Sequence, residues 1–329
     1  MAGIPLSVLE LAIVREGGNA HTAIEGTVEV ARHTESLGYK RIWMAEHHNM
    51  EHIASSATSV LIGHVAGKTQ HIRVGSGGIM LPNHAPLVIA EQFGTLETLY
   101  PGRIDLGLGR APGTDQLTAM VLRRNNMSTA NNFPNDVVSL QNYFSGVNHD
   151  GKVRAFPGEG LSVPIWILGS STDSAYLAAQ MGLPYAFAAH FAPAQFRAAI
   201  GIYRQHFRPS AQLKEPYVMA CVNVMAADTD EEAEFLATSL YRMFLGLILN
   251  ERGPLQAPAP LPETYRIPEV YQAVNNMTAC TFTGDREGLR EKLSVFVAET
   301  GINELMVTSP IYEAGAKLRS FEIVKEAVG

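Results

Sequence analysis

The amino-acid sequence predicts a (β/α)8 TIM barrel, a closed parallel sheet of eight strands surrounded by helices. Short apolar runs, typical of buried strands, alternate along the chain with longer stretches of helical spacing, and this unit recurs eight times. The length of 329 residues suits one barrel with insertions. The rival arrangement is a doubly wound open sheet with a nucleotide-binding fold.

The expected helices begin and end at recognisable signals. Pro86 occupies a first-turn position that favours a helix start, and Gly38 follows a helix end, where glycine is a common cap. The run Asp228-Thr229-Asp230 caps a helix whose first turn is acidic, which suits the helix dipole. We expect strands at residues 7–14, 41–45, 72–76, 103–108, 164–168, 185–189, 217–225 and 303–308. We expect helices at residues 22–37, 56–68, 86–99, 173–181, 193–206, from 230 onward, 286–299 and at the C-terminus.

Two irregular stretches interrupt the alternation, one after strand four and one after strand seven with its helix. The first covers about 109–163 and includes helical patches at 115–124 and 136–144. The second covers about 250–282, and its residues 253–268 hold five prolines, as expected of a lid over a site or of a disordered segment. We expect residues 1–329 to form a single domain with these two insertions.

Charge and cysteine content narrow the possible functions. The net charge is −7 and no Lys/Arg run is longer than Arg123-Arg124, so a nucleic-acid partner is not expected. Cys221 and Cys280 lie far apart and match no metal-ligand spacing, so we expect no metal site and a reducing compartment. With no signal peptide and no apolar window of about 18 residues, we expect a cytoplasmic protein that does not enter a membrane.

Residues directly after each strand matter most, because a barrel forms its active site at the carboxyl ends of its strands. After strand two comes Glu46-His47-His48. Consecutive strand residues face opposite ways, so the two histidines are not expected to share one pocket wall or to bind a metal together. One of these two imidazoles is a candidate general base or proton donor in the pocket, and the alternative is a hydrogen-bonded structural histidine.

Glycine-rich runs follow strands three and four. Ser76-Gly77-Gly78 either lets the backbone approach a flat ligand or forms a simple bulge. The later run, residues 107–113 (GLGRAPG), fails the dinucleotide fingerprint because its third glycine comes one position late and Pro112 interrupts the turn. Within it, Gly109-Arg110 places a guanidinium at the barrel mouth, where it could bind a phosphate or pair with Asp115.

A hydroxyl-rich turn follows strand five, at residues 169–174 (GSSTDS). Its candidate binding residues are Gly169, Ser170, Ser171 and Ser174. Hydroxyls and amides at a helix start can bind an anion, and they can equally form an ordinary N-cap. Because Arg110 and this turn follow consecutive strands, together they could hold one phosphate monoester. The chain lacks the Gly-x-Ser-x-Gly, P-loop and His-Glu-x-x-His motifs of hydrolases and kinases.

Longer runs around these strand ends resemble the bacterial-luciferase-like monooxygenase family. The resemblance covers nearly the whole chain in the same order. It is carried by GYKRIWMAEHH at 38–48, by IRVGSGGIMLP at 72–82 with His84, Pro86 and Glu91, by PGRIDLGLGR at 101–110, and by the tail from TGD at 283–285 to ELMV at 304–307.

The resemblance implies a barrel that binds FMN in its reduced form, supplied by a separate flavin reductase. Reduced FMN reacts with O2 to give a peroxyflavin that oxidises a small-molecule substrate. The matching residues imply that His47 takes part in proton transfer and that Arg110 holds the FMN phosphate with Ser170, Ser171 and Ser174. Ser76, Gly77 and Gly78 would lie behind the isoalloxazine ring, with a non-proline cis peptide that we place at Gly77–Gly78.

Two departures from bacterial luciferase argue against light emission and long-chain aldehyde oxidation. Gly109 stands where luciferase has a cysteine, and Ser170 stands where it has a glutamate. The alternatives to an FMN monooxygenase are a deazaflavin (F420)-dependent oxidoreductase of the same superfamily and a non-catalytic flavin-binding protein. Family members often pair through their second and third helices, so a homodimer is expected.

Overall fold

The computed structural model of the chain describes residues 3–124, 127–147 and 149–329, and its core is a closed ring of parallel strands. The ring runs β1–β2–β3–β5–β6–β7–β8–β10 and returns from β10 to β1, which confirms the (β/α)8 barrel and excludes the open sheet. Its strands are β1 (Leu6–Glu10), β2 (Arg41–Met44), β3 (Arg73–Ser76), β5 (Ile104–Gly109), β6 (Ile165–Gly169), β7 (Tyr185–Ala188), β8 (Val218–Ala226) and β10 (Glu304–Thr308).

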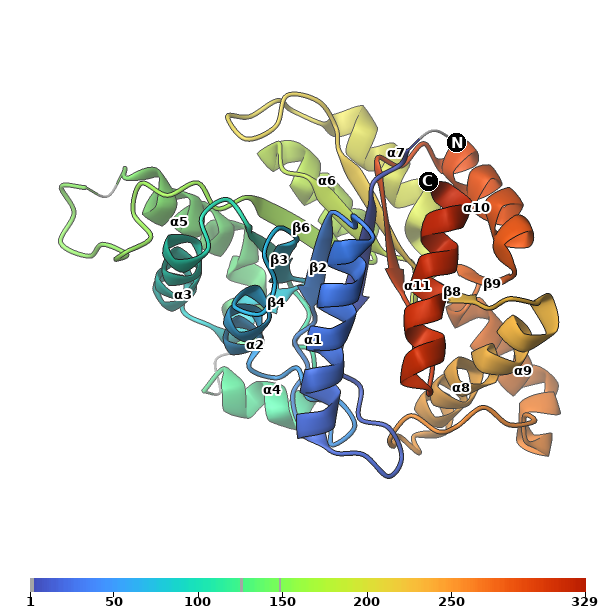
Figure 1. Ribbon diagram of the computed structural model, residues 1–329. Helices are drawn as coiled ribbons and strands as arrows, with labels where there is room; N and C mark the ends of the chain where they lie inside the picture. Colours follow the sequence, from blue (N-terminus) through green and yellow to red (C-terminus); the bar gives the residue numbers. More distant parts are fainter. Residues whose placement is uncertain (1–2, 125–126, 148) are drawn as a thin grey trace.

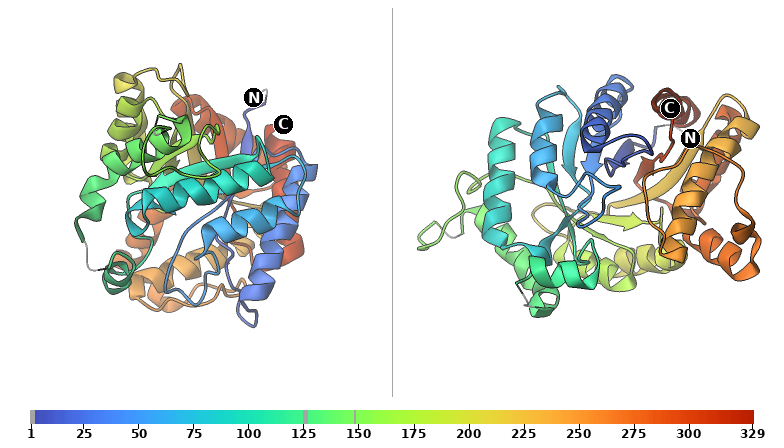
Figure 2. Two further views of the ribbon diagram at one scale, coloured as in Figure 1. Left: turned by 90° about the vertical axis from the view of Figure 1, so that its left-hand side faces the viewer. Right: turned by 90° about the horizontal axis from the view of Figure 1, so that it is seen from below.

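Helices surround the ring of strands on its outside (Figures 1 and 2). The apolar outer faces of the strands, such as Ile42 and Met44 on β2, pack against these helices in one large core. The surrounding helices are α1 (Ala20–Ser36), α2 (Thr58–Ala66), α3 (Pro86–Leu99), α5 (Phe133–Ser145), α6 (Thr172–Met181), α7 (Phe196–His206), α8 (Asp230–Leu249), α10 (Arg286–Thr300) and α11 (Ala314–Val328).

The local signals read from the sequence act as expected at three helix ends. Pro86 is the first residue of α3. Gly38 follows α1 with a φ of +75°, the left-handed region that glycine adopts most easily. Thr229 caps α8 by accepting a hydrogen bond from the Glu232 amide at 3.2 Å, and the first turn of α8 is acidic.

The first strand is shorter than the sequence predicts. β1 ends at Glu10, whereas the apolar run continues to residue 14. Ala12 has a φ of +49°, which breaks the extended conformation. Ile13 instead forms an isolated bridge with Ile53, so its apolar character serves loop packing.

The two stretches that interrupt the alternation contain more regular structure than the sequence predicts. The stretch after β5 holds α4 and α5, which match the two expected helical patches, and its residues 125, 126 and 148 lie outside the described residues. The stretch after α8 contains a helix and a strand that the sequence reasoning missed. The additional elements are β4 (Ile79–Met80), η1 (Leu81–Asn83), α4 (Gln116–Leu122), η2 (Met127–Asn132), η3 (Pro193–Gln195), η4 (Glu263–Arg266), α9 (Pro268–Met277) and β9 (Thr281–Gly284).

The proline-rich segment at 253–268 is anchored to its surroundings. Leu255 is buried, its amide donates to the Val14 carbonyl at 2.9 Å, and its own carbonyl accepts from Glu16 at 2.8 Å. Ser239 on α8 donates to the Gln256 carbonyl at 2.8 Å. These bonds fasten the segment both to the loop after β1 and to α8.

The barrel interior is built in layers. At the amino ends of the strands, buried Arg41 lies between the buried carboxylates of Asp105 (2.6 Å) and Glu304 (2.7 Å). Above this charged layer, Trp43 and Trp166 meet edge to face with ring centroids 5.2 Å apart. Both termini lie at the same end of the molecule as the charged layer, and α4 and α9 lie at the opposite end, where the strands finish (Figure 1).

Candidate active site

The carboxyl end of the barrel brings the predicted site residues together on neighbouring strands. Arg110 follows β5, and the serine-rich turn after β6 leads into α6. The Arg110 Nη2 atom lies 3.6 Å from Asp173 Oδ2 in the first turn of α6, and both side chains are largely exposed. Asp115, the alternative partner considered for Arg110, instead caps α4 through the Thr118 amide. The structure therefore places the guanidinium beside the serine-rich turn.

That turn is organised by hydrogen bonds among its own residues. Ser171 is the N-cap of α6, and its hydroxyl accepts from the Ser174 amide at 3.4 Å. The Ser174 hydroxyl donates to the Ser171 carbonyl at 2.8 Å and lies 2.9 Å from the Tyr185 hydroxyl. A Cβ at Gly169 would lie 2.1 Å from Ser174 Oγ, so glycine is what allows this close packing. Ser170 precedes the cap and is half-buried.

The glycine-rich ends of β3 and β5 pack closely together. Ser76 is fully buried, and its hydroxyl donates to the Gly107 carbonyl at 2.8 Å and accepts from the Gly107 amide at 3.0 Å. The hydroxyl of Ser76 therefore joins two strands and is not directed at a ligand. The peptide between Gly77 and Gly78 is cis, as the sequence resemblance predicts. A Cβ at Gly109 would lie 2.9 Å from Met80 Sδ, so this position is also closely packed.

His47 and His48 have different partners at the end of β2. His47 Nδ1 lies 3.3 Å from the Gly113 carbonyl, which belongs to the loop after β5. Burial lowers the pKa of the His47 imidazole, so its neutral form is favoured. His48 Nε2 instead lies 2.8 Å from the Glu46 carboxylate.

Glu46 is a central residue of this region that the sequence reasoning did not single out. Its carboxylate is buried and accepts from His48 Nε2 at 2.8 Å, from His84 Nε2 at 2.9 Å and from the Met80 amide at 3.1 Å. Burial alone would raise the pKa of the Glu46 carboxyl, but the hydrogen bonds from His48 and His84 outweigh it and bring the pKa to about 2. The position of His84, far along the chain, is what hides this cluster from sequence reasoning.

A second histidine that the sequence reasoning passed over, His190, lies close to His47. It follows β7, and its Nδ1 atom is buried without a hydrogen-bond partner among the described residues. Burial, with a smaller contribution from His47, lowers the pKa of His190 to about 3. No local sequence pattern marks this residue, because its neighbours in the chain, Ala189 and Phe191, are apolar and carry no chemistry.

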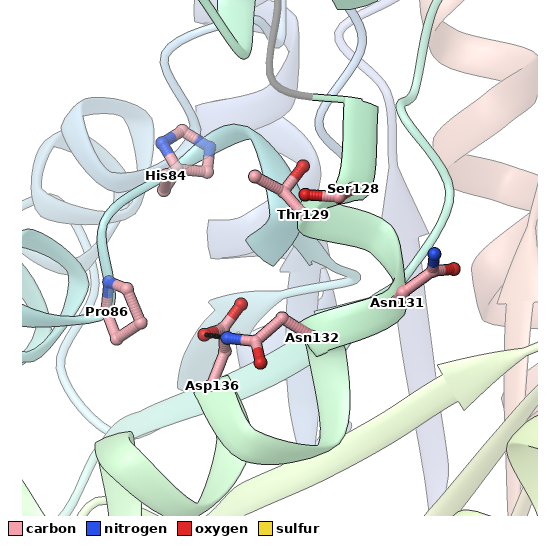
Figure 3. Close-up of a pocket in the computed structure, with 7 residues that line it drawn as sticks. All are labelled: His84, Pro86, Ser128, Thr129, Asn131, Asn132 and Asp136. Atoms are coloured by element: carbon pink, nitrogen blue, oxygen red, sulfur yellow. Dashed lines mark hydrogen bonds between the residues drawn. The ribbon is translucent and has the colours of Figure 1, made fainter.

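A cavity of about 450 Å³ lies beside this region, between the start of α3 and the start of α5. His84 lines one side, and polar residues of η2 and α5 line the other (Figure 3). The lining residues are His84, Pro86, Ser128, Thr129, Asn131, Asn132 and Asp136. The residues that line the cavity include none of the site residues predicted from the sequence, and His84 joins the cavity to Glu46 through a hydrogen bond.

Neither a metal-ligand cluster nor a membrane-spanning helix occurs within the described ranges. In this part of the chain, no three His, Cys, Asp or Glu side chains converge as metal ligands would. None of the described helices combines the length and the apolar character that crossing a bilayer requires.

A closed parallel barrel whose polar side chains gather at the carboxyl ends of its strands is the architecture of TIM-barrel enzymes. The chain belongs to the luciferase-like monooxygenase family, whose model matches residues 6–304, and it is a flavin-dependent oxidoreductase of that class. It is 48% identical to a luciferase-like monooxygenase of Escherichia coli over 98% of this chain and 96% of that protein. It is 32% identical to the N-acetyl-S-alkylcysteine monooxygenase of Bacillus subtilis over 99% and 98% of the two chains.

Solved structures show the same fold. The crystal structure of apo-MsnO8 superimposes with a TM-score of 0.90 at 31% identity, covering 99% of this chain and 98% of that one. More distant structures of this fold include the oxygenating constituent of 3,6-diketocamphane monooxygenase of Pseudomonas putida in complex with FMN, and an F420-dependent secondary alcohol dehydrogenase. Their TM-scores are 0.73 and 0.71. At 15% and 14% identity, these two structures show that the barrel fold is shared.

Proposed function

We propose that this chain is an FMN-dependent monooxygenase that uses reduced FMN and O2 to oxidise a small organic substrate. The observation that carries the proposal is the approach of Arg110 to the first turn of α6, where Ser171 and Ser174 present hydroxyls. A guanidinium beside a helix N-terminus suits a phosphate monoester, because it adds paired charged hydrogen bonds to the amides and dipole of the helix.

The residues at the barrel mouth fit the remainder of this cofactor. In the proposal, Arg110, Ser170, Ser171 and Ser174 hold the phosphate, and the close-packed backbone at Gly77–Gly78, with Ser76 buried beneath it, supports the flat ring. Glycines at 109 and 169 keep the strand ends free of side chains beside the phosphate site. Reduced FMN, when bound, would supply the two electrons that reduce one atom of O2 to water while the other atom enters the substrate.

His47 is the proposed proton-transfer residue. Because burial lowers its pKa, the imidazole is neutral near pH 7 and can accept a proton as well as donate one. The contact between its Nδ1 atom and the Gly113 carbonyl requires a proton on Nδ1, which leaves Nε2 as the acceptor. The Gly113 carbonyl therefore fixes the tautomer in which His47 would act.

Partners and assembly complete the proposal. The reduced flavin would come from a separate reductase that binds transiently. A homodimer through α2 and α3 would cover Val60, Val88 and Leu99, which are exposed apolar residues of these two helices. Light scattering during size-exclusion chromatography measures the assembly directly, and a monomeric mass would remove the dimer from the proposal.

The test is a titration of the purified protein with FMN, reduced FMN and deazaflavin. Binding of each is monitored through the change in absorbance or fluorescence. Anaerobic mixing of the reduced-FMN complex with O2 then shows whether the protein delays the return of oxidised flavin relative to free reduced FMN. We expect tight binding of reduced FMN and such a delay. Binding of deazaflavin alone would replace the proposal by an F420-dependent reaction, and binding of no flavin would contradict the proposed site.

The substrate panel follows from the relatives. A relative at 32% identity is named for oxidation of an N-acetyl-S-alkylcysteine, so thioethers belong on the panel beside aldehydes and ketones. Oxygen incorporation is measured with 18O2 and mass spectrometry of the product. The absence of labelled product with every compound would leave flavin binding standing and would contradict these substrate classes.

A further inference from the structure

His190 lies two residues after the end of β7, at the carboxyl end of the barrel. On β7, Tyr185 and Phe187 pack in the outer core with the helices, whereas Ala186 belongs to the interior cluster of the barrel. Ala189, the first residue after the strand, packs in the outer core again. The backbone here is fixed from the neighbouring strand, because Asn223 Nδ2 on β8 donates to the His190 carbonyl at 2.5 Å.

The two histidines that meet at the mouth come from opposite sides of the barrel. In the eight-strand ring, β2 and β7 are separated by three strands on either side, so they face each other across the axis. His47 follows β2 and His190 follows β7, yet the two imidazoles influence each other electrostatically. Both residues follow the carboxyl ends of their strands, so they flank the barrel mouth on opposite sides.

The Nδ1 atom of His190 lacks a partner inside the protein. It is buried, and no donor or acceptor among the described residues satisfies it. Leaving a buried polar atom unsatisfied costs about 1–3 kcal/mol, so such atoms are rare unless something else binds them. A neutral imidazole can offer this nitrogen as an acceptor or as an N–H donor.

We propose that His190 Nδ1 hydrogen-bonds the ring system of the bound flavin, which lies between His190 and His47 over the barrel axis. This inference rests on the proposed function. A flavin ring carries carbonyl oxygens, ring nitrogens and an N–H along one edge, so it matches either state of the imidazole. His190 is then a cofactor-contacting residue supplied by β7, on the far side of the ring from His47.

The first test compares FMN affinity in three variants of the full chain. In His190→Ala the hydrogen bond is lost, and we expect FMN to dissociate about tenfold more readily, the scale of one buried hydrogen bond. His190→Gln keeps a side chain that can donate and accept a hydrogen bond, and we expect its FMN affinity to lie between those of the parent protein and His190→Ala. The matched control is His71→Gln, at an exposed histidine before β3, which should bind FMN like the parent protein.

The second test observes His190 itself in the parent protein labelled with 15N-histidine. Assigned by its absence in His190→Gln, the Nδ1 resonance should shift on addition of oxidised FMN, a readout that needs no turnover. If the parent protein binds FMN but His190→Ala binds it equally well and the resonance does not move, the inference fails while the proposed function stands. If the parent protein binds neither FMN nor deazaflavin, both fail together.

Discussion

The Nε2 atom of His84 lies 2.9 Å from Glu46 Oε1, and this hydrogen bond joins the end of β2 to η1. Because an ionised carboxylate can only accept, His84 must carry its proton on Nε2. His84 also lines the cavity beside the site (Figure 3). Glu46 thus orients an imidazole that comes from a distant part of the chain.

Replacement of Glu46 by glutamine should destabilise the protein. Glu46→Gln loses the charge-assisted hydrogen bonds from His48 and His84, and the free energy of unfolding should fall by about 1.5–3 kcal/mol. Urea denaturation measures the loss. Glu51→Gln, at an exposed position in the same loop, is the control and should change stability by less than about 0.5 kcal/mol. Equal stability of the two variants would show that the Glu46 cluster contributes nothing.

The same carboxylate makes stability depend on pH in a defined window. The pKa of Glu46 is about 2 in the folded protein and 4.5 in its ordinary state, so the folded state favours the ionised form. Its contribution is complete above pH 4.5 and is lost as the pH falls toward 2. The difference in free energy of unfolding between the parent protein and Glu46→Gln should therefore shrink as the pH falls from 4.5 to about 2. A gap that is constant with pH would contradict the depressed pKa.

Substitutions of Arg110 and of Asp173 should change FMN affinity in opposite directions. Arg110→Ala removes the proposed phosphate ligand and should weaken FMN binding by about 1–3 kcal/mol. Asp173→Asn removes a negative charge that lies 3.6 Å from the guanidinium and should strengthen binding a few-fold. Isothermal titration with FMN and with riboflavin, which lacks the phosphate, separates the two effects. Equal losses for both ligands in Arg110→Ala would remove Arg110 from the phosphate site.

The charged layer at the other end of the barrel should affect stability without affecting the site. Arg41→Met leaves the buried carboxylates of Asp105 and Glu304 short of one cation and should cost about 3–5 kcal/mol. Arg197→Met, which breaks an exposed pair with Glu299, should cost less than about 1 kcal/mol. Folded Arg41→Met should bind FMN like the parent protein, because the charged layer lies at the opposite strand ends. Reduced FMN affinity of Arg41→Met would show that the charged layer is coupled to the site.

Two glycine substitutions test the close packing of β3 against β5. A Cβ at Gly107 would lie 2.2 Å from the Ser76 carbonyl, so the strands must separate in Gly107→Ala, at a cost of about 1–3 kcal/mol or more. Gly26 lies within α1 and a Cβ there meets nothing within 4 Å. Gly26→Ala should therefore stabilise by about 0.5–1 kcal/mol. Thermal denaturation measures the stability of both variants. A change of Tm in the same direction for Gly107→Ala and Gly26→Ala would contradict this packing.

The match between sequence and structure is best where a local pattern suffices. The predicted helix 86–99 coincides with α3, because Pro86 fixes its start and Pro101-Gly102 prevents its continuation. The end of β1 was misplaced because the apolar run continues through Ala12, whose positive φ depends on the surrounding loops. The sequence does not predict α9 because proline-rich residues precede it and its packing against α8, η4 and η3 comes from the tertiary structure.

The sequence by itself determined the order of strands and helices, the barrel, the family and the strand-end positions of His47, Arg110 and the serine-rich turn. Hydrophobic periodicity and helix capping depend on residues that are near in the sequence, so they can be recognised from the sequence alone. The tertiary structure alone decided that Glu46 would hold His84 and that β7, which precedes His190, would lie across the barrel from β2, which precedes His47. Closure of the ring brings strands that are distant in the sequence within reach of one another, and no local pattern encodes which of their side chains then meet.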